Sequence, residues 1–176
     1  MSDDSAPLHL AAISLGSNID PVENLKAAVR ELARSGIIHR VSRVWESAPV
    51  GDFDQPNFLN AALLWETSLP WEELKPKVLA PIERNLKRVR DPQNINAPRT
   101  IDLDLSLFLT PTQSWVLDAE ILSRAFVAIP LAEILPEFIH PDTGQTLNEI
   151  AAKFDPLSEG LLPRPDCELR ETINRR

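Results

Sequence analysis

Two aspartates separated by a single residue carry the clearest chemical signal in this chain. Asp102 and Asp104 alternate with the apolar Ile101 and Leu103. In a β-strand, residues two positions apart point to the same face, so the two carboxylates would lie roughly 7 Å apart on the face opposite the core. Like charges this close repel unless a cation neutralises them, and oxygen ligands without His or Cys favour Mg²⁺. On this pattern alone, the solvated face of an amphipathic strand is the stronger interpretation.

Basic residues upstream of this pair favour a site. They are Arg84, Lys87, Arg88, Arg90 and Arg99. A guanidinium group can bind two phosphate oxygens at once, so arginines beside paired carboxylates indicate a nucleotide polyphosphate held with a metal. Taken alone, the same residues are better explained as a helix surface with salt bridges to Glu72, Glu73 and Glu83. The combination with the two aspartates reverses that preference.

A second candidate surface begins at Phe58. Phe58 and Asn60 would share one face of a strand, which places a flat apolar ring beside an amide with both donors and an acceptor. Such a surface suits a planar ligand with hydrogen-bonding edges. A core aromatic and a strand-end amide explain these residues equally well, and Phe126 is open to the same two interpretations.

The composition disfavours several classes of protein. Lys and Arg number 18 against 26 Asp and Glu, a net charge of −8, so we expect neither nucleic acid nor a membrane as partner. The single Cys167 cannot form an internal disulfide, and His9, His39 and His140 lack metal-ligand spacing. Phosphate-binding glycine loops of the P-loop and Rossmann types are absent, so side chains and metal would have to hold any nucleotide.

The order of predicted elements indicates the fold. We expect strands at 9–15, 37–47, 58–67 and 100–109, with the second and third forming a long-looped hairpin. We expect a helix capped by Asp20 and closed by Gly36, and a second capped by Ser68 that Pro76 and Pro81 interrupt. Further helices are expected near 120–124, 131–135 and 148–154, the last with a Thr146–Glu149 capping box.

This order, β-α-β-β-α-β with additions, is the split βαβ plan of a ferredoxin-like α+β fold, an antiparallel sheet with helices packed on it. We expect a disordered start at residues 1–7 and one domain over 8–176. The N-terminal residues lack a signal-peptide pattern and no apolar run is long enough for a membrane span, so we expect a cytoplasmic protein. A monomer is favoured.

Several motifs resemble those of the 6-hydroxymethyl-7,8-dihydropterin pyrophosphokinase family. The two specific ones are APVG followed by DQPNFLNA at 48–61, and APRTIDLD at 97–104. LGSN at 15–18, RVR at 88–90, RAFV at 124–127 and PLAEI at 130–134 follow in the family's order. The resemblance covers most of the chain and implies a ferredoxin-like fold, in agreement with the plan above.

The resemblance also implies a reaction and a set of site residues. The pyrophosphoryl group of ATP would pass to the hydroxymethyl oxygen of the dihydropterin, giving AMP and the pterin diphosphate used in folate biosynthesis. Asp102 and Asp104 would hold two Mg²⁺ ions, with Arg88 and Arg99 as catalytic partners. The implied ATP contacts are Glu83, Arg88, Arg90, Arg99, Leu105 and Arg124. The implied pterin contacts are Pro49, Val50, Phe58, Asn60 and Phe126.

The chain departs from the family pattern on the nucleotide side. The family's lid tryptophan is missing from the segment before Pro98, and the stretch between Phe108 and Arg124 is short. Asp118 stands where the family has a histidine, and its charge would repel phosphate. Two alternatives therefore stay open: a pterin-binding relative that has altered or lost ATP-dependent activity, and an enzyme with another pterin-like substrate or phosphate donor.

Overall fold

An antiparallel sheet forms the centre of the protein. The structure is a computed structural model and describes residues 7–51 and 54–174. Within these residues, seven strands are paired in the order β6-β5-β1-β4-β3-β7, with β2 also on β4. They are β1 (His9–Ser17), β2 (Ile37–Val41), β3 (Trp45–Ser47), β4 (Phe58–Thr67), β5 (Asp102–Leu109), β6 (Ser114–Val116) and β7 (Leu162–Pro163). The sheet and its packed helices confirm the predicted α+β class.

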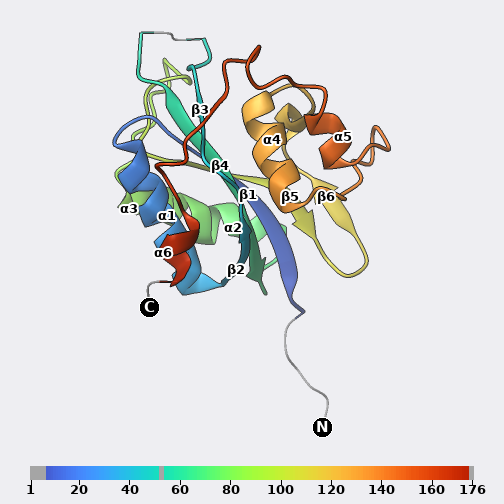
Figure 1. Cartoon of the computed structure of the whole chain (residues 1–176). Helices are drawn as coiled ribbons and strands as arrows, with labels where there is room; N and C mark the ends of the chain where they lie inside the picture. The colour runs from blue at the N-terminus through green and yellow to red at the C-terminus, as the bar shows by residue number, and fades with distance from the viewer. Residues whose placement is uncertain (1–6, 52–53, 175–176) are drawn as a thin grey trace.

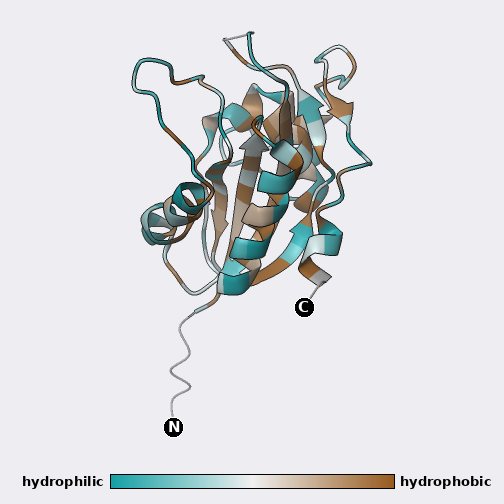
Figure 2. Cartoon of the chain, turned by 90° about the vertical axis from the view of Figure 1, so that its left-hand side faces the viewer, coloured by the Kyte–Doolittle hydropathy of each residue, from teal (hydrophilic) through white to brown (hydrophobic). Residues whose placement is uncertain are grey.

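Helices cover both faces of the sheet (Figure 1). On one face lie α1 (Pro21–Ser35), α2 (Trp71–Leu74), the π-helical turn η1 (Lys75–Leu79), α3 (Ala80–Asn85) and α6 (Arg170–Asn174). On the other lie α4 (Ala125–Ile134) and α5 (Leu147–Ala151), with the 3₁₀ turn η2 (Ala119–Leu122) before them. Each face therefore buries its own apolar cluster. In Figure 2 the strands are largely hydrophobic, whereas the helices carry hydrophilic segments.

The predicted hairpin is confirmed, with changes at its strands. β4 has the predicted bounds and pairs with both β2 and β3, because the expected strand at 37–47 is interrupted after Val41. β1 runs two residues further than predicted, through Gly16 to Ser17. Pairing on both sides keeps that end extended, since Gly16 lies opposite Asn60 of β4 and Asp102 of β5.

The predictions for the helix ends were partly wrong. α1 begins at Pro21 as expected, but Asp20 has a left-handed φ of 44° and its side chain makes no capping hydrogen bond. α2 begins after Pro70 rather than at a Ser68 cap. α1 ends at Ser35, and Gly36 follows it as predicted, with an extended φ of −177°. Glycine is needed at position 36 for packing, because a Cβ there would lie 2.4 Å from the backbone oxygen of Glu66.

The two prolines after α2 do not break the helical segment. η1 joins α2 to α3 without a gap, and the amide of Ala80 donates to the carbonyl of Lys75, five residues back. A π-helical turn widens the helix locally and so accommodates residues that lack an N–H group, such as Pro76 and Pro81. The sequence predicted a kink or two short helices here. The structure instead has one continuous helical segment that changes from α-helix to π-helix and back.

The chain after β5 differs most from expectation. α4 starts at Ala125, six residues before the predicted helix at 131–135, and contains Pro130. The predicted helix at 120–124 is the 3₁₀ turn η2. The Thr146–Glu149 capping box is confirmed at α5. The predicted disordered start covers residues 1–7, of which residues 1–6 lie outside the described part of the chain. No described helix is both long enough and apolar enough to span a membrane.

β5 carries a bulge beyond the two aspartates. Ile13 of β1 lies opposite Leu105, but its neighbour Ala12 lies opposite Leu107, so Ser106 is the extra residue. A bulge of this kind leaves two consecutive residues opposite one partner and kinks the strand. Leu107 accordingly packs in the α4–α5 cluster, while Leu103 packs in the cluster under α1.

Candidate functional site

A cavity of about 520 Å³ opens where the two central strands end. This volume lies within the usual range for small-molecule sites. The cavity is lined by residues of β1, β3, β4, β5, η2 and the start of α4, and by residues of the loops that precede β4, β5 and η2. Eight of its lining residues are predicted site residues: Val50, Phe58, Asn60, Arg99, Asp102, Asp104, Arg124 and Phe126. Pro49 is buried and does not line it.

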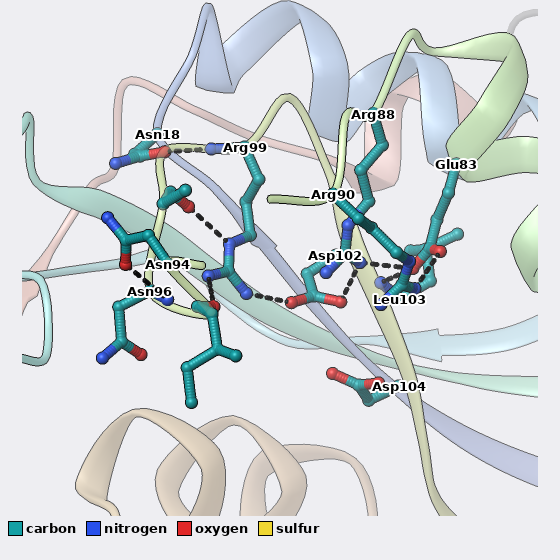
Figure 3. Close-up of polar contacts among 12 residues, drawn as sticks. Asn18, Glu83, Arg88, Arg90, Asn94, Asn96, Arg99, Asp102, Leu103 and Asp104 are labelled. Carbon is teal, nitrogen blue, oxygen red and sulfur yellow. Dashed lines mark hydrogen bonds and ion pairs between the residues drawn. The ribbon is translucent and has the colours of Figure 1, made fainter. Parts of the chain in front are cut away.

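Asp102 lies between two arginines (Figure 3). Arg99 donates from Nη1 to Asp102 Oδ2 at 2.6 Å, and Arg88 donates from its own Nη1 to Oδ1. Burial acts to raise the pKa of Asp102, but the hydrogen bonds and charges of Arg88 and then Arg99 outweigh it and hold that pKa below its ordinary value. Asp102 is therefore ionised at neutral pH and fixes both guanidinium groups.

Asp104 has a different environment on the same face of β5. Its side chain is 58% exposed, and Lys75 Nζ lies 3.2 Å from its Oδ1. Protein atoms that displace water, and then the charge of Asp102, raise its pKa above the ordinary value despite Lys75. The ionised form of Asp104 is therefore disfavoured in the free protein, and a bound cation would stabilise it. Leu105 lines a second cavity, of about 450 Å³, together with Lys75 and Asp104.

Glu83 on α3 fixes the basic residues around this pair. Its side chain is only 4% exposed, and its oxygens accept from Arg88 at 2.7 Å, Arg90 at 3.0 Å and Lys75 at 3.2 Å. The same carboxylate accepts from the backbone N–H of Leu103 at 3.0 Å. Glu83 therefore positions the arginines from behind and does not line the cavity, although the resemblance implies an ATP contact.

The end of α3 directs Arg88 back toward Glu83. Lys87 adopts a left-handed φ of 60°, and the backbone N–H of Arg88 donates to the Glu83 carbonyl. This is the six-to-one hydrogen bond of a Schellman helix end, where glycine is the usual residue at the left-handed position.

A smaller cavity of about 320 Å³ is lined by Arg88, Arg90 and Arg99 among others. Arg84 and Lys87 are exposed and line neither cavity.

The apolar side of the main cavity contains two aromatic rings and an amide. Phe58 and Phe126 both line it, and the Arg99 guanidinium carbon lies 5.7 Å from the centre of the Phe58 ring. Asn60 donates from Nδ2 to Ser47 Oγ at 2.9 Å, and among the described residues its carboxamide oxygen has no donor. The carboxamide oxygen of Asn60, a residue that lines the cavity, is therefore available as an acceptor.

Sequence reasoning missed Asn18 as a positioning residue. It is 3% exposed and accepts from the backbone N–H of Arg99 at 2.8 Å. Its Nδ2 donates to Gln55 Oε1 at 2.8 Å and to the carbonyl of Pro56 at 3.1 Å. Asn18 thus joins the loop before β4 to the loop before β5. A polar amide directly after an apolar strand was the available signal.

Asp118 also lines the cavity, and both of its carboxylate oxygens accept hydrogen bonds from the protein. Oδ1 accepts from the backbone N–H of Glu120 at 2.9 Å, which caps η2, and Oδ2 accepts from Ser106 Oγ at 3.3 Å. The residue is half-buried. Asp118 and Asp104 line the same cavity. The repulsion between Asp118 and a bound phosphate stays a prediction.

The charges of the cavity fit a bound cation. Four lining residues are acidic (Asp102, Asp104, Asp118 and Glu120) and two are basic (Arg99 and Arg124), so the lining itself carries more negative than positive side chains. The described residues contain no cluster of three or more His, Cys, Asp or Glu that could hold a metal. Asp102 and Asp104 supply the oxygen donors that Mg²⁺ prefers, and substrate phosphates commonly supply further ligands. The residues present therefore fit Mg²⁺ bound together with a phosphate ligand.

Comparison with known proteins decides the family. Residues 12–136 match the family model of 7,8-dihydro-6-hydroxymethylpterin-pyrophosphokinase (HPPK). The chain belongs to the HPPK family. The matched segment contains every site residue of this HPPK chain discussed above.

Curated relatives and solved structures agree with this assignment. A 2-amino-4-hydroxy-6-hydroxymethyldihydropteridine pyrophosphokinase from Synechocystis sp. is 34% identical over 165 residues, covering 87% of this HPPK chain and 83% of that protein. One of the same name from Methylorubrum extorquens is 39% identical, covering 83% and 94%. The crystal structure of wild-type Plasmodium falciparum HPPK-DHPS with SDX-DHP has a TM-score of 0.65 at 13% identity. It shares the fold with 97% of this chain, which spans about half (48%) of that longer chain.

Proposed function

We propose that this protein transfers the pyrophosphoryl group of ATP to 6-hydroxymethyl-7,8-dihydropterin, giving AMP and the pterin diphosphate, as a step in folate biosynthesis. The observation that carries the proposal is that one cavity is lined both by the Asp102/Asp104 pair and by Phe58, Asn60 and Phe126. A site for polyphosphate and metal thus adjoins a site for a flat, hydrogen-bonding ring. The family membership and the relatives' names support the same reaction.

The chain's own residues would act mainly by positioning and charge. Phe58 and Phe126 would stack on the pterin ring, and the Asn60 oxygen would accept from its edge. Arg99 and Arg88, fixed by Asp102 and Glu83, would bind phosphate oxygens, with Arg90 and Arg124 on the outer side. Asp102 and Asp104 would hold two Mg²⁺ ions, which supply charge neutralisation at the triphosphate. Such an arrangement suits phosphoryl transfer, where positioning and electrostatics dominate catalysis.

The direct test is product formation. The purified protein is incubated with MgATP and the dihydropterin, and AMP and the pterin diphosphate are separated by chromatography. Equal amounts of both products are expected, and ADP is not. Pterin binding without AMP formation would overturn the proposal in favour of a binding protein. Monomeric state and cytoplasmic location stay predictions from the sequence.

Asn60→Ala is expected to weaken dihydropterin binding by about 1–3 kcal/mol. The substitution removes the acceptor and leaves a polar ring edge without a partner in the cavity. Isothermal titration calorimetry with the pterin measures the effect, and Asn148→Ala, at an exposed position on α5, is the matched control. An unchanged affinity in Asn60→Ala would contradict the assignment of the ring edge to Asn60.

Asp118→Asn is expected to tighten MgATP binding about two- to tenfold without changing pterin affinity. A phosphate about 5 Å from Asp118 experiences roughly 1 kcal/mol of repulsion at the dielectric constant of water and about 3 kcal/mol at 20, and partial exposure favours the lower figure. Asn retains the capping function at η2, so the change isolates the charge. Titration of the protein with MgATP checks it, and an unchanged affinity would show that the carboxylate lies away from the nucleotide.

A further inference from the structure

The C-terminal segment 161–167 runs along the free side of β3. Leu161 is buried in a cluster with Trp45, and β7 pairs with β3 so that Leu162 lies opposite Glu46. The backbone N–H of Arg164 donates to the carbonyl of Val44 at 2.8 Å. β3 would otherwise be a three-residue edge strand, held only by β4. Segment 161–167, called the strap below, lies beyond residues 12–136, which match the family.

One carboxylate links the strap to the loop at the pterin side of the cavity. Arg164 donates from Nη1 to Glu46 Oε2 at 2.7 Å, and Asn57 donates from Nδ2 to Glu46 Oε1 at 2.8 Å. The hydrogen bonds from Asn57 and then Arg164 hold the pKa of Glu46 below its ordinary value, so it is ionised at neutral pH. Glu46 precedes loop 48–57 and Asn57 ends it. The Glu46 carboxylate therefore connects both ends of this loop to the strap.

The loop ends in turn hold residues that line the cavity. Ser47, next to Glu46, lines it and accepts from Asn60 Nδ2 at 2.9 Å. Phe58, next to Asn57, lines it as well. Any change in the separation of Glu46 and Asn57 would therefore move Phe58 and the support of Asn60, although Arg164 itself does not line the cavity.

We propose that the strap is a positioning element for the pterin pocket, and that Arg164 acts through Glu46 and Asn57 to hold Ser47 and Phe58, at the two ends of the loop before β4, in their binding positions. The proposal rests on the proposed function in naming the pterin as ligand. The linkage is half-buried, with 32% of the Arg164 side chain and 24% of the Glu46 side chain exposed, so its expected effect is moderate. Arg164 also pairs with Asp166 at 2.7 Å, which provides a control on the same side chain.

The test compares Arg164→Gln, Glu46→Gln and their combination with Asp166→Asn and Arg164→Lys. Arg164→Gln and Glu46→Gln are each expected to raise the KM and Kd for the dihydropterin about three- to tenfold, with kcat and MgATP affinity close to wild type. The double variant is expected to lose little more than either single variant, because both remove one interaction. Asp166→Asn is expected to behave like the wild type, and Arg164→Lys to recover part of the loss.

Hydrogen–deuterium exchange of the ligand-free protein separates this proposal from the proposed function. Amides in segment 48–60 are expected to exchange faster in Arg164→Gln than in Asp166→Asn, whether or not the protein turns over ATP. If the wild type bound no pterin while this difference remained, the proposed function would fail and the positioning role would stand. Equal exchange in the two variants, or additive losses in the double variant, would overturn the positioning role.

Discussion

Asp102→Asn and Asp104→Asn will each reduce pyrophosphoryl transfer by about a thousandfold or more. Each removes an anionic oxygen from the pair that would hold the metal, and several kcal/mol of barrier correspond to at least three powers of ten in rate. Single-turnover measurement with MgATP and the dihydropterin checks this, with circular dichroism to show that the fold is retained. A variant with near-normal turnover would contradict the two-metal assignment.

The same two variants are expected to change stability in opposite directions. Arginines lower the pKa of Asp102, so its ionised form stabilises the fold above its unfolded pKa, and Asp102→Asn loses that contribution at neutral pH. The raised pKa of Asp104 means that its charge opposes folding once the pH exceeds the unfolded value. Asp104→Asn is therefore expected to raise the urea midpoint at pH 7 while it abolishes activity. A lower midpoint in Asp104→Asn would contradict this electrostatic account.

Glu83→Ala is expected to lower the free energy of unfolding by about 3–5 kcal/mol. The change removes the buried partner of Arg88, whose side chain is 9% exposed, and leaves the Leu103 amide without its acceptor. Arg88 keeps Asp102 as a partner, so the loss combines a buried guanidinium that has lost one of its two carboxylates with a buried amide that has lost its acceptor. Urea denaturation measures it, and Glu72→Ala on the exposed side of α2 is the control, expected within about 0.5 kcal/mol of wild type.

Glu83→Gln distinguishes charge from shape at the same position. Gln can still accept from the Leu103 amide, so this variant should be more stable than Glu83→Ala but should hold Arg88 and Arg90 less firmly. Weaker MgATP binding in Glu83→Gln, with unchanged pterin binding, is the expected result. A loss below 1 kcal/mol in Glu83→Ala would show that Glu83 is not the anchor of this network.

Features with a local origin were predictable from sequence. The alternation of Asp102, Leu103 and Asp104 places the carboxylates on one face of any strand, and the Thr146–Glu149 capping box needs only four residues. β4 was predicted to the residue because its apolar run ends at clear breaks. The motif resemblance supplied the roles of the aromatic and basic residues, which their spacing left open.

Features that depend on distant contacts were not predictable. Glu83 reads as a surface residue of a helix, and only the packing of α3 on β5 buries it against Leu103. Pro76 reads as a helix breaker, and whether a helix kinks or widens depends on what packs around it. β7 has two residues, one of them Pro163, so it has no periodicity to detect.

The bulge at Ser106 determines which length changes β5 can accept. The apolar end of the strand, at Leu107 and Phe108, faces the two clusters in a register set by its pairing with β1. Loss of Ser106 would remove the bulge and still leave Leu105 opposite Ile13 and Leu107 opposite Ala12, so the two aspartates and the apolar end would both keep their faces. Loss of a residue from the regularly paired part of β5 would instead shift one end by one position and turn its side chains to the opposite face of the sheet. Among divergent copies of this gene, a change in the length of this strand should therefore fall at the bulge.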